Sequence, residues 1–167
     1  PKCLDVAKKV SMERVHDELM KMLESDKPSI GLELMRKSGL LSLYMPELEK
    51  GVKVSQPKPF HKYDVYWHSL YSCDKSPKQK PILRLAALLH DIKKIDSLKT
   101  GTGHAQEGWL LLNKLGYSEV AEIVKQHVFL DQDNSSPIVK EEEVVNYSDK
   151  RVRHSDVVPL KERFEYL

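Results

Sequence analysis

The chain has 167 residues, which suits one domain with a small appendage, and its 40% of hydrophobic residues is enough for a core. The formal net charge is only +2 although 31% of the residues are charged, so bulk electrostatics do not single out nucleic acid as a partner. No apolar run approaches the roughly 20 residues of a membrane-spanning helix, and the start of the chain lacks the apolar core of a signal peptide, so we expect no membrane association.

Cysteine usage is sparse and favours a reduced compartment. The two cysteines, Cys3 and Cys73, are far apart and form no CxxC pattern. Two cysteines spaced in this way give little reason to expect a disulfide, and a cytoplasmic location is the simpler interpretation. The sequence begins at Pro1 rather than at a methionine, which suggests a segment of a longer protein.

Residues 1–50 are predicted to form a small helical segment. Apolar residues recur at helical spacing in "SMERVHDELMKMLES", where Ser11 can cap the first turn. "KPSIGLELMRKSG" predicts a second helix, with Pro28 at its start and Gly39 just past its end. "LLSLYMPEL" predicts a short third one. Residues 51–62 contain glycine and two prolines, and we interpret them as a linker.

A second unit, residues 63–155, is also predicted to be helical, and residues 156–167 are taken as a tail. Helical patterns run through "YDVYWHSLYSCDK", "KPILRLAALLHDIKK", "HAQEGWLLLNKLG", "SEVAEIVKQHVFL" and "KEEEVVNYSDKRVRH". "SLKTGTG", which follows the second of these, is interpreted as a loop. Strand signals are few because alternation of valine and isoleucine is nearly absent. The predicted fold is therefore all-α: a helical bundle preceded by a small helical segment.

Each predicted helix of the second unit carries a side chain that can bind a metal ion, and the central helix carries two. In chain order these residues are His68, His90, Asp91, His104, His127 and Asp149. Taken alone, each histidine is more often a core or boundary residue, and an aspartate is more often a salt-bridge partner. Together they supply imidazole and carboxylate groups, which divalent transition metals accept as ligands. Ligands from several helices of a bundle can converge on one rigid site.

Asp91 lies at the C-terminal end of the most apolar predicted helix. The helix dipole disfavours an anion at that end, which indicates a cation nearby. Either Lys94, one turn further on, or a metal ion can supply the positive charge.

The order and context of these residues resemble the HD superfamily of metal-dependent phosphohydrolases. "VYWHSL" resembles the first histidine helix of that family, "LRLAALLHDIKK" its defining His-Asp helix, "GHAQEG" and "VKQHV" its two optional histidines, and "NYSDKRV" its closing aspartate segment. The resemblance implies that the main metal is held by His68, His90, Asp91 and Asp149. It implies that His104 and His127 support a second metal or contact the substrate phosphate. These ligands accept Mn, Fe, Co, Ni, Zn or Mg, as one or two ions.

Two positions depart from the family pattern. Lys93 stands where the family usually has glycine, and Ser148 replaces its usual alanine. The additional lysine can strengthen phosphate binding, crowd the metal or face solvent. The serine is expected to be harmless.

Several side chains are candidates for the chemistry and for binding phosphate. Asp91 can steer a nucleophilic water, and Lys94, four residues after His90 on the same predicted helix face, can offset phosphate charge. Arg84 and Arg151 are further candidates for phosphate binding. A snorkelling boundary residue explains Arg84 about equally well, and a solvated helix face is the preferred interpretation of Arg151.

The N-terminal pattern from "SMERV" to "MPEL" resembles the helical RNA-binding segment of bacterial tRNA nucleotidyltransferases and poly(A) polymerases, some of which carry an HD domain directly afterwards. We find no strand-rich head with a paired-carboxylate motif, so this chain is not expected to add nucleotides. The resemblance implies a metal-dependent phosphohydrolase acting on phosphoester bonds of nucleotides, cyclic nucleotides or RNA ends, within a tRNA nucleotidyltransferase-like protein. The alternatives are an RNA- or tRNA-binding module with a vestigial metal site, or a helical domain that forms a homodimer.

Overall fold

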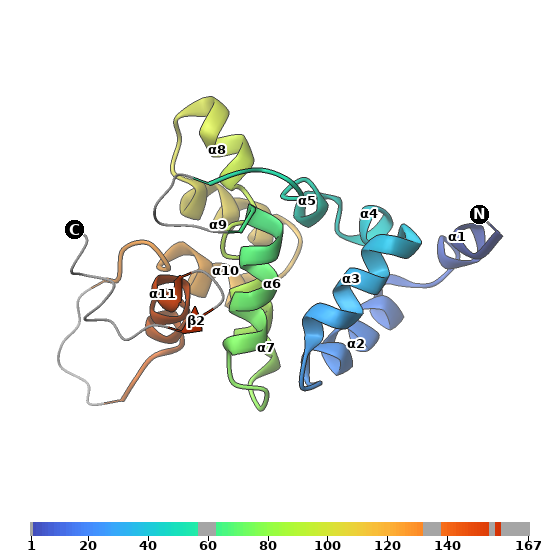
Figure 1. Cartoon of the computed structure of the whole chain (residues 1–167), viewed down its shortest axis with the longest axis horizontal. Coiled ribbons are helices and arrows are strands. Elements are labelled where there is room, and N and C mark those ends of the chain that lie inside the picture. Colours follow the sequence, from blue (N-terminus) through green and yellow to red (C-terminus); the bar gives the residue numbers. More distant parts are fainter. Residues whose placement is uncertain (1, 57–62, 132–137, 154–155, 158–167) are drawn as a thin grey trace.

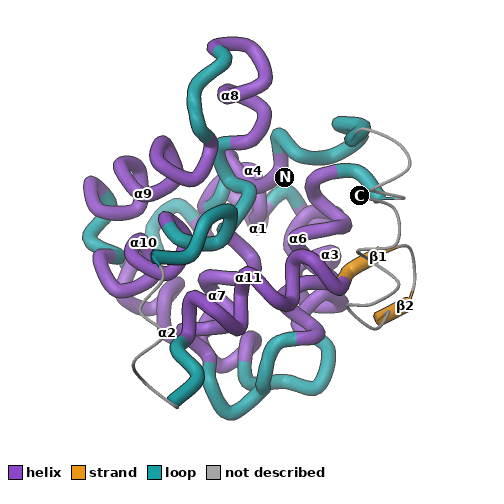
Figure 2. Tube along the Cα trace, turned by 90° about the vertical axis from the view of Figure 1, so that its left-hand side faces the viewer, coloured by secondary structure: helices purple, strands orange, loops and turns teal. Residues whose placement is uncertain are grey.

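The computed structural model describes residues 2–56, 63–131, 138–153 and 156–157. Side chains are described for residues 4–56, 63–131 and 138–150. Within these ranges the fold is all-α, as the sequence predicts, apart from one pair of two-residue strands. The helices and the strand pair are shown in Figure 1 and Figure 2.

The first part of the chain is a group of short helices: α1 (Lys2–Ala7), α2 (Met12–Leu23), α3 (Pro28–Ser38), α4 (Leu40–Tyr44) and α5 (Pro46–Glu49). Pro28 begins α3, and Gly39 ends it in the left-handed conformation, with a φ of 81°. Ser11 is the N-cap residue of α2, but its side chain accepts no capping hydrogen bond, contrary to the sequence prediction. Helix α1 was not predicted.

The second part contains α6 (Val65–Lys75), α7 (Pro81–Leu89), α8 (Lys94–Thr100), α9 (His104–Lys114), α10 (Ser118–Lys125) and α11 (Glu141–Arg151). Strands β1 (Val152–Arg153) and β2 (Asp156–Val157) follow, and they pair antiparallel with Val152 opposite Val157. Helix α7 lies at the centre and packs against α2, α6, α10 and α11. Its residues from Leu83 to Leu89 are all buried, which is typical of a helix covered on every side.

The central helix is shorter than predicted. It ends at Leu89, His90 is its C-cap residue, and the chain turns before α8 begins at Lys94. Lys94 is therefore not on the same helix as His90. Helix α8 also includes residues 97–100, which were predicted to lie in a loop.

The described part of the predicted linker is fastened to the start of α6. The backbone N–H groups of Val65 and Tyr66 donate to the carbonyl oxygens of Val54 and Gly51. The Asp64 carboxylate accepts from the backbone N–H of Trp67, at 2.8 Å, and caps the helix. This anchoring fixes the position of α6, which carries His68.

Candidate metal centre

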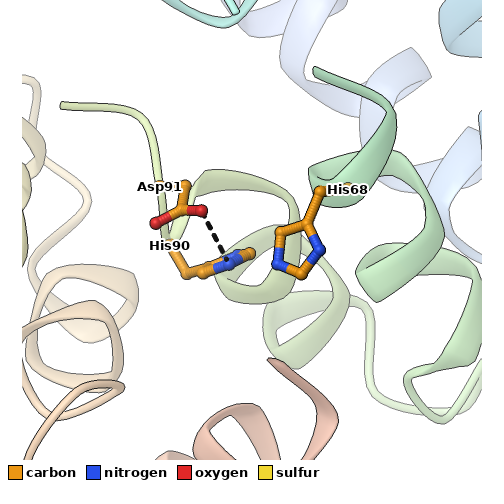
Figure 3. Close-up of side chains that lie close together, drawn as sticks. All are labelled: His68, His90 and Asp91. Atoms are coloured by element: carbon orange, nitrogen blue, oxygen red, sulfur yellow. Dashed lines mark ion pairs between the residues drawn. The ribbon is translucent and has the colours of Figure 1, made fainter. Parts of the chain in front are cut away.

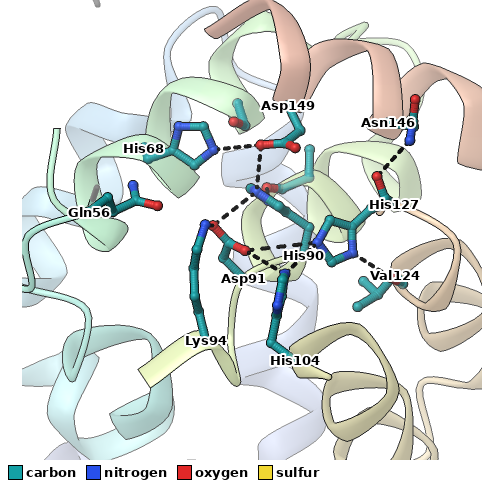
Figure 4. Close-up of polar contacts among 12 residues, drawn as sticks. Gln56, His68, His90, Asp91, Lys94, His104, Val124, His127, Asn146 and Asp149 are labelled. Carbon is teal, nitrogen blue, oxygen red and sulfur yellow. Dashed lines mark hydrogen bonds and ion pairs between the residues drawn. The ribbon is translucent and has the colours of Figure 1, made fainter. Parts of the chain in front are cut away.

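Five separate segments bring the six predicted ligands together. His68 comes from the middle of α6, and His90 and Asp91 follow the end of α7. His104 is the first residue of α9, His127 lies two residues beyond the end of α10, and Asp149 is on α11. Figure 4 shows their polar ends pointing toward one another. The site thus lies where the ends of several helices meet around the buried helix α7.

One group of potential ligands surrounds His90. The ligand atoms of His68, His90 and Asp91 lie within 4.8 Å of one another, and all three residues are buried; Figure 3 shows this group. Asp149 closes it: its Oδ1 lies 2.8 Å from His68 Nε2 and 3.4 Å from His90 Nε2. His68 of α6 and Asp149 of α11 therefore lie close enough to His90 and Asp91 to form one group of ligands with them.

A second group shares Asp91. The ligand atoms of Asp91, His104 and His127 also lie within 4.8 Å of one another. His104 Nε2 is 3.3 Å from Asp91 Oδ1, and the Nε2 atoms of His104 and His127 are 3.0 Å apart. Because Asp91 Oδ2 faces His90 while Oδ1 faces the other two histidines, its carboxylate can serve both groups.

The surrounding charges keep the carboxylates ionised. Burial by itself would raise the pKa of Asp91, but His90, His104 and Lys94 hold that pKa well below its usual range. His68 and His90 do the same for the pKa of Asp149. These anions are held in a place that suits a cation.

Two of the three buried histidines of the centre, His90 and His127, differ in their affinity for a proton. Burial opposes protonation of His90, but the negative charges of Asp91 and Asp149 outweigh it and raise its pKa to about 10. Burial and the neighbouring charge of His90 lower the pKa of His127 to about 4. His127 is therefore neutral at physiological pH and offers a lone pair.

The orientation of the buried histidines fits metal ligation. The Nδ1–H groups of His90 and His127 donate to the carbonyl oxygens of Ala87, at 2.8 Å, and Val124, at 2.6 Å. Such bonds to backbone carbonyls are typical of metal-binding histidines, because they fix the ring and direct Nε2 at the ion. An ion bound to His90 would take the place of the proton on its Nε2. Within the described residues, His90 Nε2 is buried and has no partner with hydrogen-bond geometry. The residues present therefore fit a divalent cation.

Lys94 belongs to the centre although it begins a new helix. Its Nζ lies 2.7 Å from Asp91 Oδ2, and its side chain is 18% exposed. Lys94 is thus one of the two cations that the sequence indicates as partners of Asp91. Because its side chain is partly exposed, a bound anion can also reach its ammonium group.

Two other predicted phosphate-binding residues, Lys93 and Arg84, make their contacts outside the cluster. Lys93 pairs with Asp96 at 2.5 Å. Arg84 is buried, and the prediction that it binds phosphate is wrong: its Nε and Nη1 donate to the carbonyl oxygens of Ser76, Leu23 and Ser25. The side chain of Arg151 lies outside the described residues.

Two polar residues near the centre were missed in the sequence. Asn146, on α11, donates to the carbonyl oxygen of His127 at 2.7 Å and accepts from Lys150. Gln56 is buried in the segment before α6. Asn146 stands one turn before Asp149 on the same helix, a spacing that could have indicated it. Gln56 carries no such signal, because it lies in a stretch without periodicity.

Comparison with protein families agrees with this geometry. A family model described as the HD domain matches residues 61–153. The chain belongs to the HD domain family. In this HD protein, residues 1–51 match a second family model, described as the probable RNA- and SrmB-binding site of polymerase A. Both predicted resemblances are thereby confirmed.

The curated relatives of this HD protein include tRNA-processing enzymes. The multifunctional CCA protein of Teredinibacter turnerae is 34% identical over 62% of this chain and 27% of its own length. The CC-adding tRNA nucleotidyltransferase of Thermus thermophilus is 31% identical over 70% of this chain and 31% of its own length. The A-adding tRNA nucleotidyltransferase of Deinococcus radiodurans is 37% identical over 49% of this chain and 20% of its own length.

The chain spans less than a third of the length of these relatives. No solved structure matches it. None of the helices in the described residues has the length and apolar character needed to cross a membrane.

Proposed function

We propose that this HD domain is a metal-dependent phosphohydrolase that cleaves phosphoester bonds of nucleotides, cyclic nucleotides or RNA ends. One observation carries the proposal: six ligand-type side chains from five segments meet at one point, with Asp91 common to both groups. Binding of RNA alone gives no reason for such a convergence.

The proposed ligands divide into two sets. His68, His90, Asp91 and Asp149 would hold one divalent ion, and Asp91, His104 and His127 a second. When bound, such ions lower the pKa of a water molecule and polarise a phosphoryl oxygen. The ligand set accepts any of Mn, Fe, Co, Ni, Zn or Mg.

The residues of the chain itself position the reaction. The ionised Asp91 carboxylate, oriented by Lys94, accepts a hydrogen bond from the attacking water and directs its oxygen toward phosphorus. The Lys94 ammonium offsets the charge of the phosphate. The new bond joins the water oxygen to phosphorus and the ester P–O bond breaks. One proton of the water ends on the leaving alkoxide, which becomes the alcohol, and the other stays on the phosphate product.

The wider context favours RNA as substrate or partner. The N-terminal match to an RNA-binding family model and the tRNA nucleotidyltransferase relatives support tRNA or another RNA. We further propose that the chain functions within a longer tRNA nucleotidyltransferase-like protein, with the boundaries 1–50, 51–62 and 63–155 as its units. A cytoplasmic location and a homodimer stay predictions.

A second candidate function is an RNA-binding module with a vestigial metal site. The observation that favours it is the RNA-binding family match over residues 1–51, which includes helices α1–α5. In that case the HD bundle would support the N-terminal helices and would hydrolyse nothing.

Hydrolysis assays separate the two functions. Bis(p-nitrophenyl) phosphate and a 2′,3′-cyclic nucleotide are offered to the protein with each divalent ion in turn. We expect turnover that falls by at least about 100-fold in Asp91→Asn and is unchanged in Asp96→Asn, an aspartate that pairs with Lys93 outside the cluster. Absence of turnover with every ion, while tRNA binding persists, would support the module instead.

A further inference from the structure

Gln56 is a buried residue beside the metal centre. The reaction proposed above assigns no role to this side chain. Its side chain is only 8% exposed, yet it belongs to the segment before α6 rather than to a helix. Figure 4 shows the side chain reaching toward His68 and Lys94 at the edge of the cluster.

The amide of Gln56 has a defined orientation. Its Nε2 donates to the carbonyl oxygen of Tyr63 at 3.3 Å. Because a carbonyl oxygen can only accept, the amide cannot be turned around without losing this bond. The other end of the amide, Oε1, is buried and has no hydrogen-bond partner within the described residues. A buried acceptor without a partner is costly, and it needs a donor from a ligand or from water.

We propose that Gln56 binds substrate by accepting a hydrogen bond from a ribose hydroxyl next to the phosphate. This inference rests on the proposed function, because it places the phosphate at the His/Asp cluster.

The chemistry of the substrate selects this donor. A phosphodiester carries only acceptor oxygens, so it cannot satisfy Oε1 itself. In a ribonucleotide, carbons 2′ and 3′ are bonded to each other, so an open phosphate on one has a hydroxyl donor immediately beside it, whereas a 2′,3′-cyclic phosphate has none. Gln56 would therefore distinguish ribonucleotides from 2′-deoxyribonucleotides and from aryl phosphates.

Binding measurements on metal-loaded protein test the proposal without relying on turnover. Calorimetry compares adenosine 3′-monophosphate, its 2′-deoxy counterpart and inorganic phosphate, each with Mn²⁺ present. We expect the wild type to prefer the ribonucleotide by about tenfold. Gln56→Leu should abolish the preference and leave phosphate affinity and Mn²⁺ content unchanged. Gln56→Glu, which also loses the bond to Tyr63 but keeps an acceptor oxygen, should retain the preference.

Gln79→Leu is the matched control, because Gln79 is exposed and precedes α7, at the end opposite His90. The proposal is overturned if the wild type shows no preference, binds no nucleotide, or keeps its preference in Gln56→Leu. An equal loss of phosphate and nucleotide affinity in Gln56→Leu would also overturn it and indicate a purely structural role. A ribose preference without hydrolysis of any substrate would contradict the phosphohydrolase while leaving the role of Gln56 intact.

Discussion

Single residues decide the chemistry of the centre, and Asp91 is the most important of them. Its two carboxylate oxygens face different histidines, and Lys94 holds one of them at 2.7 Å. The meeting of the six candidate ligands could be predicted because histidines and aspartates recur on successive helices of the bundle and together form a metal-binding set, although each taken alone is more often structural. The roles of the cations were harder to predict, since lysine and arginine serve phosphates, carboxylates and carbonyl oxygens equally well.

Arg84 shows this ambiguity and gives a prediction. Its guanidinium is buried and donates to three carbonyl oxygens at the ends of α2 and α6. Arg84→Met should lower the free energy of unfolding by about 2–4 kcal/mol, because these acceptors would stay buried without donors. Urea denaturation measures the loss, and metal content of the folded fraction should not change. The exposed Arg14→Met is the control. A stable Arg84→Met protein that no longer binds phosphate would restore the original prediction.

At the scale of elements, the apolar pattern predicted the positions of most helices, but not those of α1 and α8 or the ends of α7 and α10. His90 donates from Nδ1 to Ala87, and His127 donates in the same way to Val124. Each ring thus caps carbonyl groups at a helix end that neither glycine nor proline marks. The bond that fixes each histidine ring is therefore also a cap at the helix end, and a hydrophobic pattern contains no sign of it.

Substitution of Gly51 tests how tightly the segment before α6 is packed against the start of that helix. A Cβ there would lie 3.0 Å from Tyr66 N and 3.2 Å from Leu48 O, both backbone atoms. Gly51→Ala should therefore displace the start of α6 and cost about 1–3 kcal/mol of unfolding free energy. Gly103→Ala, where a Cβ would meet no atom within 4 Å, should be nearly neutral. Thermal or urea denaturation distinguishes the two variants. Equal stabilities would mean that the junction is looser than the structure indicates.

At the scale of the whole molecule, polar contacts join the N-terminal helices to the HD bundle. Ser29 of α3 donates to Asp74 of α6 from both its N–H and its hydroxyl. Tyr66 of α6 donates to Glu33 of α3 at 3.3 Å. The sequence predicted two helical units but not how they pack, because such contacts join residues far apart in the chain and leave no periodic pattern.

Glu33 gives this junction a pH dependence. Arg36 and, more weakly, Tyr66 lower the pKa of Glu33 below its usual 4.5. A lowered pKa stabilises the fold above pH 4.5, and this contribution is lost as the pH falls toward the folded-state value. Glu33→Gln should thus be about 1 kcal/mol less stable than the wild type at pH 7, with a smaller difference at pH 3. Urea denaturation at both pH values measures it, with the exposed Glu18→Gln as control. A difference that stays constant with pH would contradict the role of the charge.

The central claim is that six side chains from distant parts of the chain hold metal. The most direct measurement is the divalent-ion content of purified protein after saturation with Mn²⁺ and removal of excess ion. The shared carboxylate predicts two ions per chain in the wild type, one in His68→Ala and one in His104→Ala, and none in Asp91→Asn. An Asp91→Asn protein that retains the wild-type metal content, or a folded wild type that holds no ion, would contradict the account.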